Sequence, residues 1–164
     1  DVVVKPVKVD VLASLVLEIA ALEKAVITSD VADRVAEASE GSPRKALVIL
    51  EAVLNLKTEE EMLEAVQRQD QKAVAIDLAR ALINPRVGWP DVAKILRDVD
   101  EDAESLRRMI MGYCQSIMLS EKPNAGIMPR AALVLKVFSY NLYDTGKPGL
   151  TLACWEVVAV SNKK

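Results

Sequence analysis

The residues best suited to chemistry in this chain stand in one short stretch, EGSPRKAL at residues 40–47. Gly41 fits the left-handed conformation that ends a helix, Ser42 is a preferred N-cap residue, and Pro43 is typical of a first helical position. The first turn of the predicted helix then carries Arg44 and a lysine, although helix starts are already positive and usually favour acids. A helix start binds anions, and a guanidinium suits phosphate oxygens. The stretch therefore predicts an anion site at Arg44; the alternative is a solvated arginine, with or without an ion pair to the glutamate that opens the stretch.

Other reactive groups are scarce. The chain has no histidine among its 164 residues, which excludes Ser-His and Cys-His nucleophile pairs and most zinc sites. Cys114 and Cys154 each lie in an apolar helical stretch, as reduced core thiols do. The acidic run at residues 98–102 could suggest magnesium, but it lies between two helical patterns, where capping and solvation explain it. Neither G-x-x-x-x-G-K-[ST] nor G-x-G-x-x-G is present. We expect no catalytic residue and no metal site in this chain.

Composition favours packed helices. The chain is 51% hydrophobic but only 4% aromatic, and Ala, Val, Leu and Ile supply most of the apolar residues. Its net charge of −3 gives no overall basic surface for a polyanion. No apolar run approaches the ~20 residues that span a bilayer, and no signal peptide is visible. We therefore expect a cytoplasmic protein that does not contact a membrane. Because the chain opens on an apolar stub without an initiator Met, we expect it to be cut from a longer protein.

The predicted anion site belongs to a compact three-helix domain at residues 10–57, which follows a lead-in at residues 1–9. Asp10 is the predicted N-cap of its first helix, Thr28 opens the second and Ser42 caps the third. Three- and four-residue spacings predict the buried faces. In the first helix that face is Leu12, Leu15, Val16, Ile19, Leu22 and Val26, and in the third it is Ala46, Leu47, Leu50, Val53 and Leu54.

A second helical domain is predicted at residues 58–164, beyond a boundary at Leu56-Lys57-Thr58. A capping box at Thr58 opens a helix that runs to about Arg68, and Asp70 opens the next. Four further helices follow, at about residues 89–99, 100–117 with Asp100 as the cap, 130–143 and 150–161. No alternating run is long enough to predict a strand. The sequence thus predicts an all-α chain, with three helices followed by a five- or six-helix bundle.

Two functions of different classes fit the first domain on these grounds. One is a helix-turn-helix DNA-binding regulator, whose second helix would read bases with polar side chains near its start. After Arg44 and Lys45, however, the sequence ALVILEAVL offers little that could read a base edge. The other is a helical adaptor or scaffold domain without a nucleotide role.

A third interpretation comes from resemblance. Residues 21–56, ALEKAVITSDVADRVAEASEGSPRKALVILEAVLNL, resemble the lid of AAA+ ATPases, specifically of clamp-loader subunits. These include the bacterial DNA polymerase III gamma/tau subunit, the small subunits of replication factor C and phage equivalents. The family pattern is a first helix ended by glutamate, a second ending in "ia..s.G", and "GspR.AL..L" opening the third. Here these correspond to Glu23, to residues 35–41, and to residues 41–47 with Leu50.

The resemblance implies a function for each part. Arg44 would be the sensor 2 arginine, which reaches the gamma-phosphate of ATP in a neighbouring core domain, while Ser42 and Pro43 shape the nucleotide-adjacent helix start. Residues 58–164 would form the collar, which joins subunits into a ring. The expected partners are other clamp-loader subunits, the sliding clamp and primed DNA. The ATPase core with its P-loop is missing, so ATP is expected as a cofactor only with that core, and this chain alone should not hydrolyse it.

Overall fold

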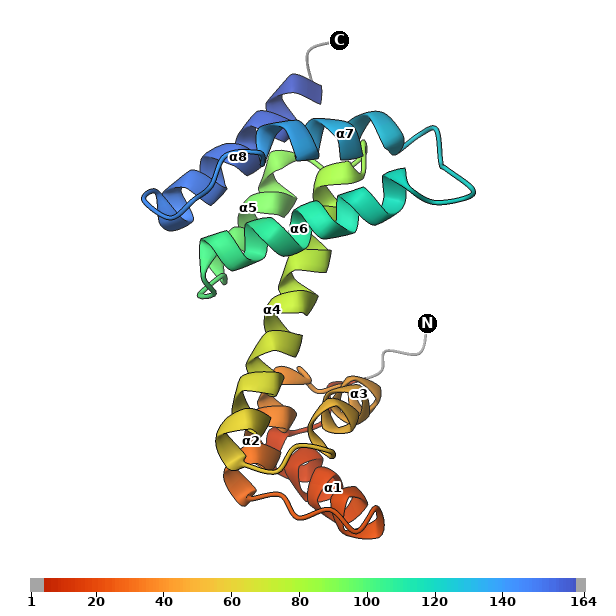
Figure 1. Ribbon diagram of the computed structural model, residues 1–164, viewed down its shortest axis with the longest axis vertical. Coiled ribbons are helices and arrows are strands. Elements are labelled where there is room, and N and C mark those ends of the chain that lie inside the picture. Colours follow the sequence, from red (N-terminus) through yellow and green to blue (C-terminus); the bar gives the residue numbers. More distant parts are fainter. Residues whose placement is uncertain (1–4, 162–164) are drawn as a thin grey trace. The chain divides into compact units, whose positions relative to one another are not determined.

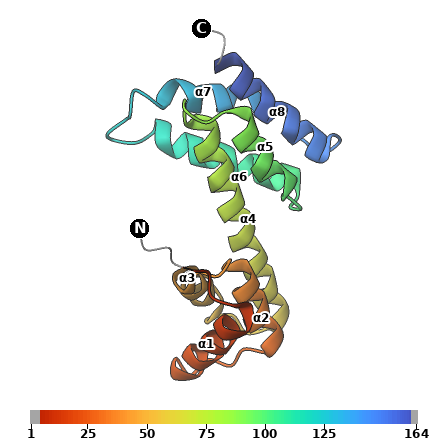
Figure 2. The same ribbon diagram turned by 180° about the vertical axis from the view of Figure 1, so that it is seen from behind.

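The computed structural model describes residues 5–161, and these form eight α-helices and no strand (Figure 1). The helices are α1 (Val9–Leu22), α2 (Ser29–Ala38), α3 (Pro43–Val53), α4 (Glu59–Ile83), α5 (Trp89–Arg97), α6 (Ala103–Met118), α7 (Met128–Val137) and α8 (Gly146–Ser161). Figure 2 shows them from behind. The all-α prediction is confirmed, and five helices follow the first three. Residues 1–4 of the predicted lead-in lie outside the described residues.

The chain divides into two compact units between Asp70 and Gln71, inside α4, whereas the sequence indicated a boundary near Lys57. The reason is that Met62 and Val66, from the first half of α4, are buried in the core of the first unit. The prediction of one helix to Arg68 and another from Asp70 was wrong. No glycine or proline interrupts this segment, so its two apolar stripes belong to one helix.

In the first unit, α1, α2 and α3 pack against one another. Asp10 lies in the first turn of α1 and is not its cap, because the helix begins at Val9 after Lys8. The predicted stripe on α1 was too long: Leu22 and Val26 are 75% and 89% exposed, since the helix ends at Leu22. In α3 the buried face is Ala46, Ile49, Leu50 and Val53, which follow the spacing of a helix, and Leu47 is 41% exposed.

Several predicted caps are confirmed. The hydroxyl of Thr28 accepts a hydrogen bond from the Val31 amide, at 3.3 Å, and so caps α2. At the start of α4, Thr58 and Glu61 form the predicted capping box, each side chain accepting from the backbone amide of the other. These short-range contacts follow from residue type and spacing alone.

The second unit builds one core from the second half of α4 and from α5 to α8, and α8 contacts α5, α6 and α7. Asp102, not Asp100, caps α6, because its carboxylate accepts from the amide of Ser105 at 2.8 Å. Helix α7 spans Met128–Val137 and is shorter than predicted, since Phe138 ends it and turns inward as a core residue. No helix among the described residues is both long and apolar enough to span a bilayer.

Both thiols lie in this core, and we expect them to be unreactive while the protein is folded. Burial raises the pKa of Cys114 to about 11 and that of Cys154 to about 12, and the thiolate is the reactive form. A thiol-specific chromogenic reagent at pH 8 should label neither residue in native protein and both in guanidinium chloride. Rapid labelling of either thiol without denaturant would contradict the buried placement.

Candidate functional site

The candidate site is the start of α3, and a tight turn places it. Helix α2 ends at Ala38, and the buried hydroxyl of its C-cap residue, Ser39, donates to the carbonyl of Ala36 at 2.6 Å. Glu40 and Gly41 both adopt left-handed backbone conformations, with φ of 51° and 80°. The predicted left-handed conformation of Gly41 is therefore confirmed, and the chain reverses direction here to begin α3.

The roles predicted for Ser42 and Pro43 in this helix start are confirmed as local structure. The Ser42 hydroxyl accepts a hydrogen bond from the amide of Lys45 at 3.3 Å, and Pro43 is the first residue of α3. The carbonyl of Ser42 accepts from the amide of Ala46 at 3.0 Å. Since Pro43 has no N–H, the amide of Arg44 is the one first-turn donor without a hydrogen-bond partner among the described residues.

The two cations of this turn have different surroundings. The ammonium of Lys45 lies 3.1 Å from the carboxylate of Glu40, and the Lys45 side chain is only 27% exposed. Arg44 is exposed, and its guanidinium makes no hydrogen bond or ion pair within residues 5–161. The alternative of a solvated arginine agrees with the exposure of Arg44, but the ion pair with Glu40 is made by Lys45 and not by Arg44.

Electrostatically, the positive charge of Arg44 has no bonded carboxylate among the described residues. The N-terminal end of the helix dipole and the guanidinium of Arg44 are both positive. Glu40, the acid within the turn, already bonds Lys45. Such a group of donors suits the oxygens of a phosphate or a carboxylate that arrives from outside the turn.

Comparisons of this chain with protein-family models, with curated proteins and with solved structures found no match. The sequence and the geometry of the described residues therefore carry the functional argument.

The acidic run at residues 98–102 is accounted for by local contacts. In the acidic run before α6, Asp102 caps the helix and Glu101 accepts from the amide of Asp100 at 3.1 Å. Within residues 5–161 there is no group of three or more Cys, Asp or Glu side chains that could hold a metal ion. Trp89 and Trp155 form an edge-to-face pair with ring centroids 5.2 Å apart, and Trp155 stays 46% exposed.

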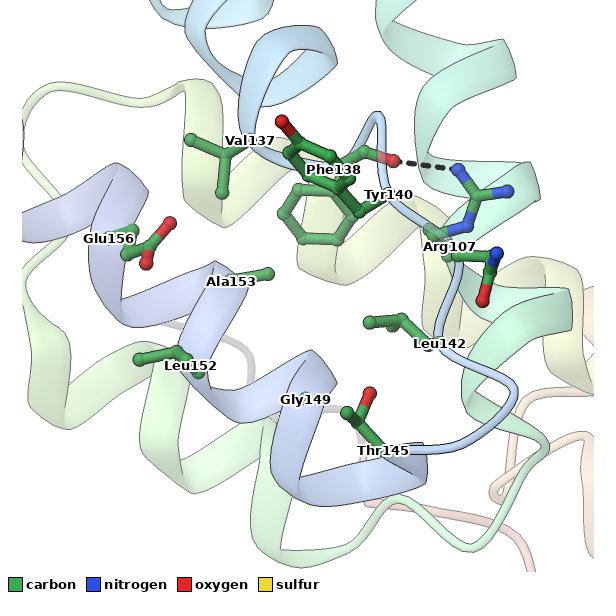
Figure 3. A pocket seen from close by; sticks show the side chains of 11 residues that line it. Arg107, Val137, Phe138, Tyr140, Leu142, Thr145, Gly149, Leu152, Ala153 and Glu156 are labelled. Atoms are coloured by element: carbon green, nitrogen blue, oxygen red, sulfur yellow. Dashed lines mark hydrogen bonds between the residues drawn. The ribbon is translucent and has the colours of Figure 1, made fainter.

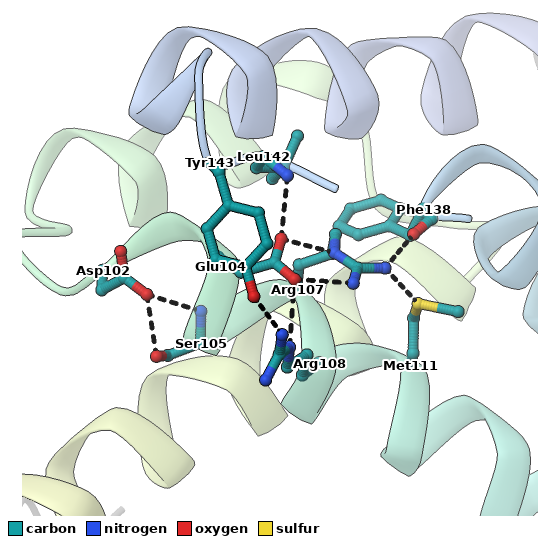
Figure 4. Close-up of polar contacts among 9 residues, drawn as sticks. All are labelled: Asp102, Glu104, Ser105, Arg107, Arg108, Met111, Phe138, Leu142 and Tyr143. Carbon is teal, nitrogen blue, oxygen red and sulfur yellow. Dashed lines mark hydrogen bonds and ion pairs between the residues drawn. The ribbon is translucent and has the colours of Figure 1, made fainter. Parts of the chain in front are cut away.

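Sequence reasoning missed a buried charge cluster in the second unit. Glu104 was not among the residues singled out from the sequence, yet it is only 3% exposed. Its carboxylate accepts hydrogen bonds from Arg107 at 2.7 and 2.8 Å, from Arg108 at 3.0 Å and from the amide of Leu142 at 2.8 Å; the same bonds are drawn in Figure 4. Arg107 also donates to the carbonyl of Phe138 at 2.6 Å. The spacing of Glu104 from both arginines, three and four residues, was the available signal.

This cluster fixes the segment that forms one wall of a cavity of about 220 Å³ (Figure 3). Phe138, Leu142 and Ala153 line the cavity with apolar atoms. Its one cationic residue, Arg107, is already occupied by Glu104 and by a backbone carbonyl. The cavity also has Tyr140, Thr145 and Glu156 in its lining, but no pair of nucleophile and base is identified there among the described residues, and the start of α3 stays the better candidate site.

Proposed function

We propose that this chain is the lid and collar region of a clamp-loader ATPase subunit of the AAA+ class, which helps to load a sliding clamp onto primed DNA. The observation that carries the proposal is the state of Arg44. Its guanidinium is exposed and without a partner among the described residues, at a helix start where Ser42 and Lys45 already satisfy the neighbouring groups.

The residues of the turn fit a phosphate group that another domain presents. Arg44 offers its guanidinium fork and its own amide, while Glu40, the acid within the turn, is bonded by Lys45 and not by Arg44. Ser42 and Pro43 hold the helix start in place, so Arg44 needs little reordering to bind. In the proposed protein the phosphate is the gamma-phosphate of ATP, which a core domain outside this chain would bind and hydrolyse.

Binding at Arg44 would act on the whole three-helix unit. Arg44 is followed in α3 by Ala46, Ile49 and Leu50, which are buried against α1 and α2. Packed interiors transmit displacement with little deformation. A displacement of the first turn of α3 would therefore move α1, α2 and α3 together, as expected of a lid that reports nucleotide state.

The second unit fits a collar role because it has a core of its own and because α8 carries exposed apolar side chains. Leu152, Trp155 and Val160 are 57%, 46% and 56% exposed on that helix. Exposed apolar side chains that gather on one element suit contacts with other proteins. In the proposed assembly these contacts are with neighbouring clamp-loader subunits.

The complete coding sequence provides the first test. We expect a P-loop within roughly 150–250 residues before Asp1, the length of one nucleotide-binding domain. The encoded protein, with its partner subunits, should place a sliding clamp on primed DNA in the presence of ATP, and the isolated 164-residue chain should bind ATP weakly or not at all. A coding sequence without a P-loop would refute the proposal and favour the helical adaptor.

A further inference from the structure

The segment that precedes α1 is packed against the turn that positions Arg44. The amide of Val7 donates to the carbonyl of Gly41 at 2.9 Å. Pro6 lies so close to Gly41 that a Cβ added there would be 2.4 Å from the Cβ of Pro6 and 2.9 Å from its Cα. Gly41 is therefore required twice, for its φ of 80° and for this close approach.

The same turn is held firmly on its other sides. Ser39 bonds the last turn of α2 through its hydroxyl, and the amide of Ser42 donates to the carbonyl of Ser39 at 3.0 Å. The ion pair of Glu40 with Lys45 ties the turn to the first turn of α3. These contacts join the turn to α3 as one rigid element. A displacement of Gly41 would therefore also displace the start of that helix.

We infer that Pro6 and Gly41 are positioning residues for Arg44, because they fix the position of the segment that precedes α1 relative to the first turn of α3. The inference rests on the proposed function and adds a mechanical link to it. Gly41 is three residues before Arg44, and Pro6 is three residues before α1. A displacement of the segment that precedes α1 would therefore be transmitted to the turn before Arg44 through the contact between Pro6 and Gly41, and not through the core.

The contact itself can be tested on the 164-residue chain by amide hydrogen exchange. In Gly41→Ala and in Pro6→Gly we expect the Val7 amide to exchange faster by on the order of tenfold, while α3 keeps its protection. Gly146→Ala is the matched control, because Gly146 also has a positive φ, of 54°, but no atom within 4 Å of an added Cβ. It should leave Val7 unchanged. Unaltered exchange at Val7 in both test variants would overturn the inference.

The role of the contact is tested in the complete protein with a double-mutant cycle. We expect Pro6→Gly to lower kcat for clamp loading about tenfold and to leave the KM for ATP nearly constant. In an Arg44→Ala background, Pro6→Gly should have no further effect, because its influence acts through Arg44. A purely structural contribution would instead lower the rate by the same factor in both backgrounds.

The outcomes separate the inference from the proposed function. Equal effects of Pro6→Gly in both backgrounds, in a protein that loads clamps, overturn the inference alone. A complete protein that loads no clamp overturns the proposed function, and with it the role of Pro6, even where the Val7 amide behaves as expected.

Discussion

Replacement of Glu104 by alanine is expected to cause the largest loss of stability of any single polar substitution in the second unit. The Glu104 carboxylate accepts four hydrogen bonds, and its removal leaves the largely buried guanidinium of Arg107 without its counter-ion. It also leaves the buried amide of Leu142 unbonded. Breaking a buried pair from one side is much more costly than losing a surface pair. We expect the melting temperature to fall by on the order of 10 °C, measured by circular dichroism or calorimetry.

Two variants separate charge and burial in this prediction. Glu64→Ala removes a similar ion pair, with Arg68 four residues later, but both side chains are about 70% exposed, and stability should barely change. Glu104→Gln keeps the shape and removes the charge, and should lie between the alanine variant and the unaltered protein. An unchanged melting temperature in Glu104→Ala would contradict the buried cluster.

The same carboxylate should leave a signature in acid unfolding. Hydrogen bonds from Arg107, the amide of Leu142 and Arg108 lower the pKa of Glu104 from its ordinary 4.5 to about 2. Because the folded-state pKa is lower, the stabilisation is complete above about pH 4.5 and is lost as the pH falls toward 2. Over this range the stability of Glu104→Gln should therefore fall less steeply than that of the unaltered protein.

The features of the α2–α3 turn that follow from short-range rules were predictable from sequence. Gly41 needs a left-handed conformation, Ser42 caps, and Pro43 fits a first helical position, and all three depend only on neighbouring residues. The pairing of Lys45 with Glu40 was not predicted, because both cations of the first turn are close enough in sequence to reach that carboxylate. The choice between them depends on which side chain the helix directs toward it.

Long-range contacts could not be predicted on these grounds. Pro6 and Gly41 are 35 positions apart, and Glu104 and Leu142 are 38 apart. An acid in the first turn of a helix is favoured for local reasons, so the burial of Glu104 has no distinctive pattern in the sequence. The unit boundary inside α4 was missed for a related reason, since a helix that is buried by two different cores has no break in its own pattern.

In the proposed clamp-loader subunit, Arg44→Ala is expected to lower ATP-dependent clamp loading on the order of 10²-fold, the usual effect of removing one donor that stabilises a reacting phosphate or oxyanion. The isolated chain should keep its melting temperature, because the Arg44 side chain is exposed and makes no contact that stabilises the fold among residues 5–161. Loading is followed by fluorescence of a labelled clamp on primed DNA, and stability by circular dichroism.

Two further variants test whether the loss is specific to Arg44 and whether its ligand is a phosphate. Arg34→Ala removes another exposed arginine from the same unit, one that pairs with Glu37 at 3.3 Å on the surface of α2, and loading should be nearly unchanged. Arg44→Lys keeps the charge but not the planar fork, so it should restore part of the activity if a phosphate is the ligand. Unimpaired loading by Arg44→Ala would remove the sensor role and leave Arg44 as a solvated surface residue. A loss with Arg44→Ala and partial rescue with lysine would support an anion that arrives from another domain.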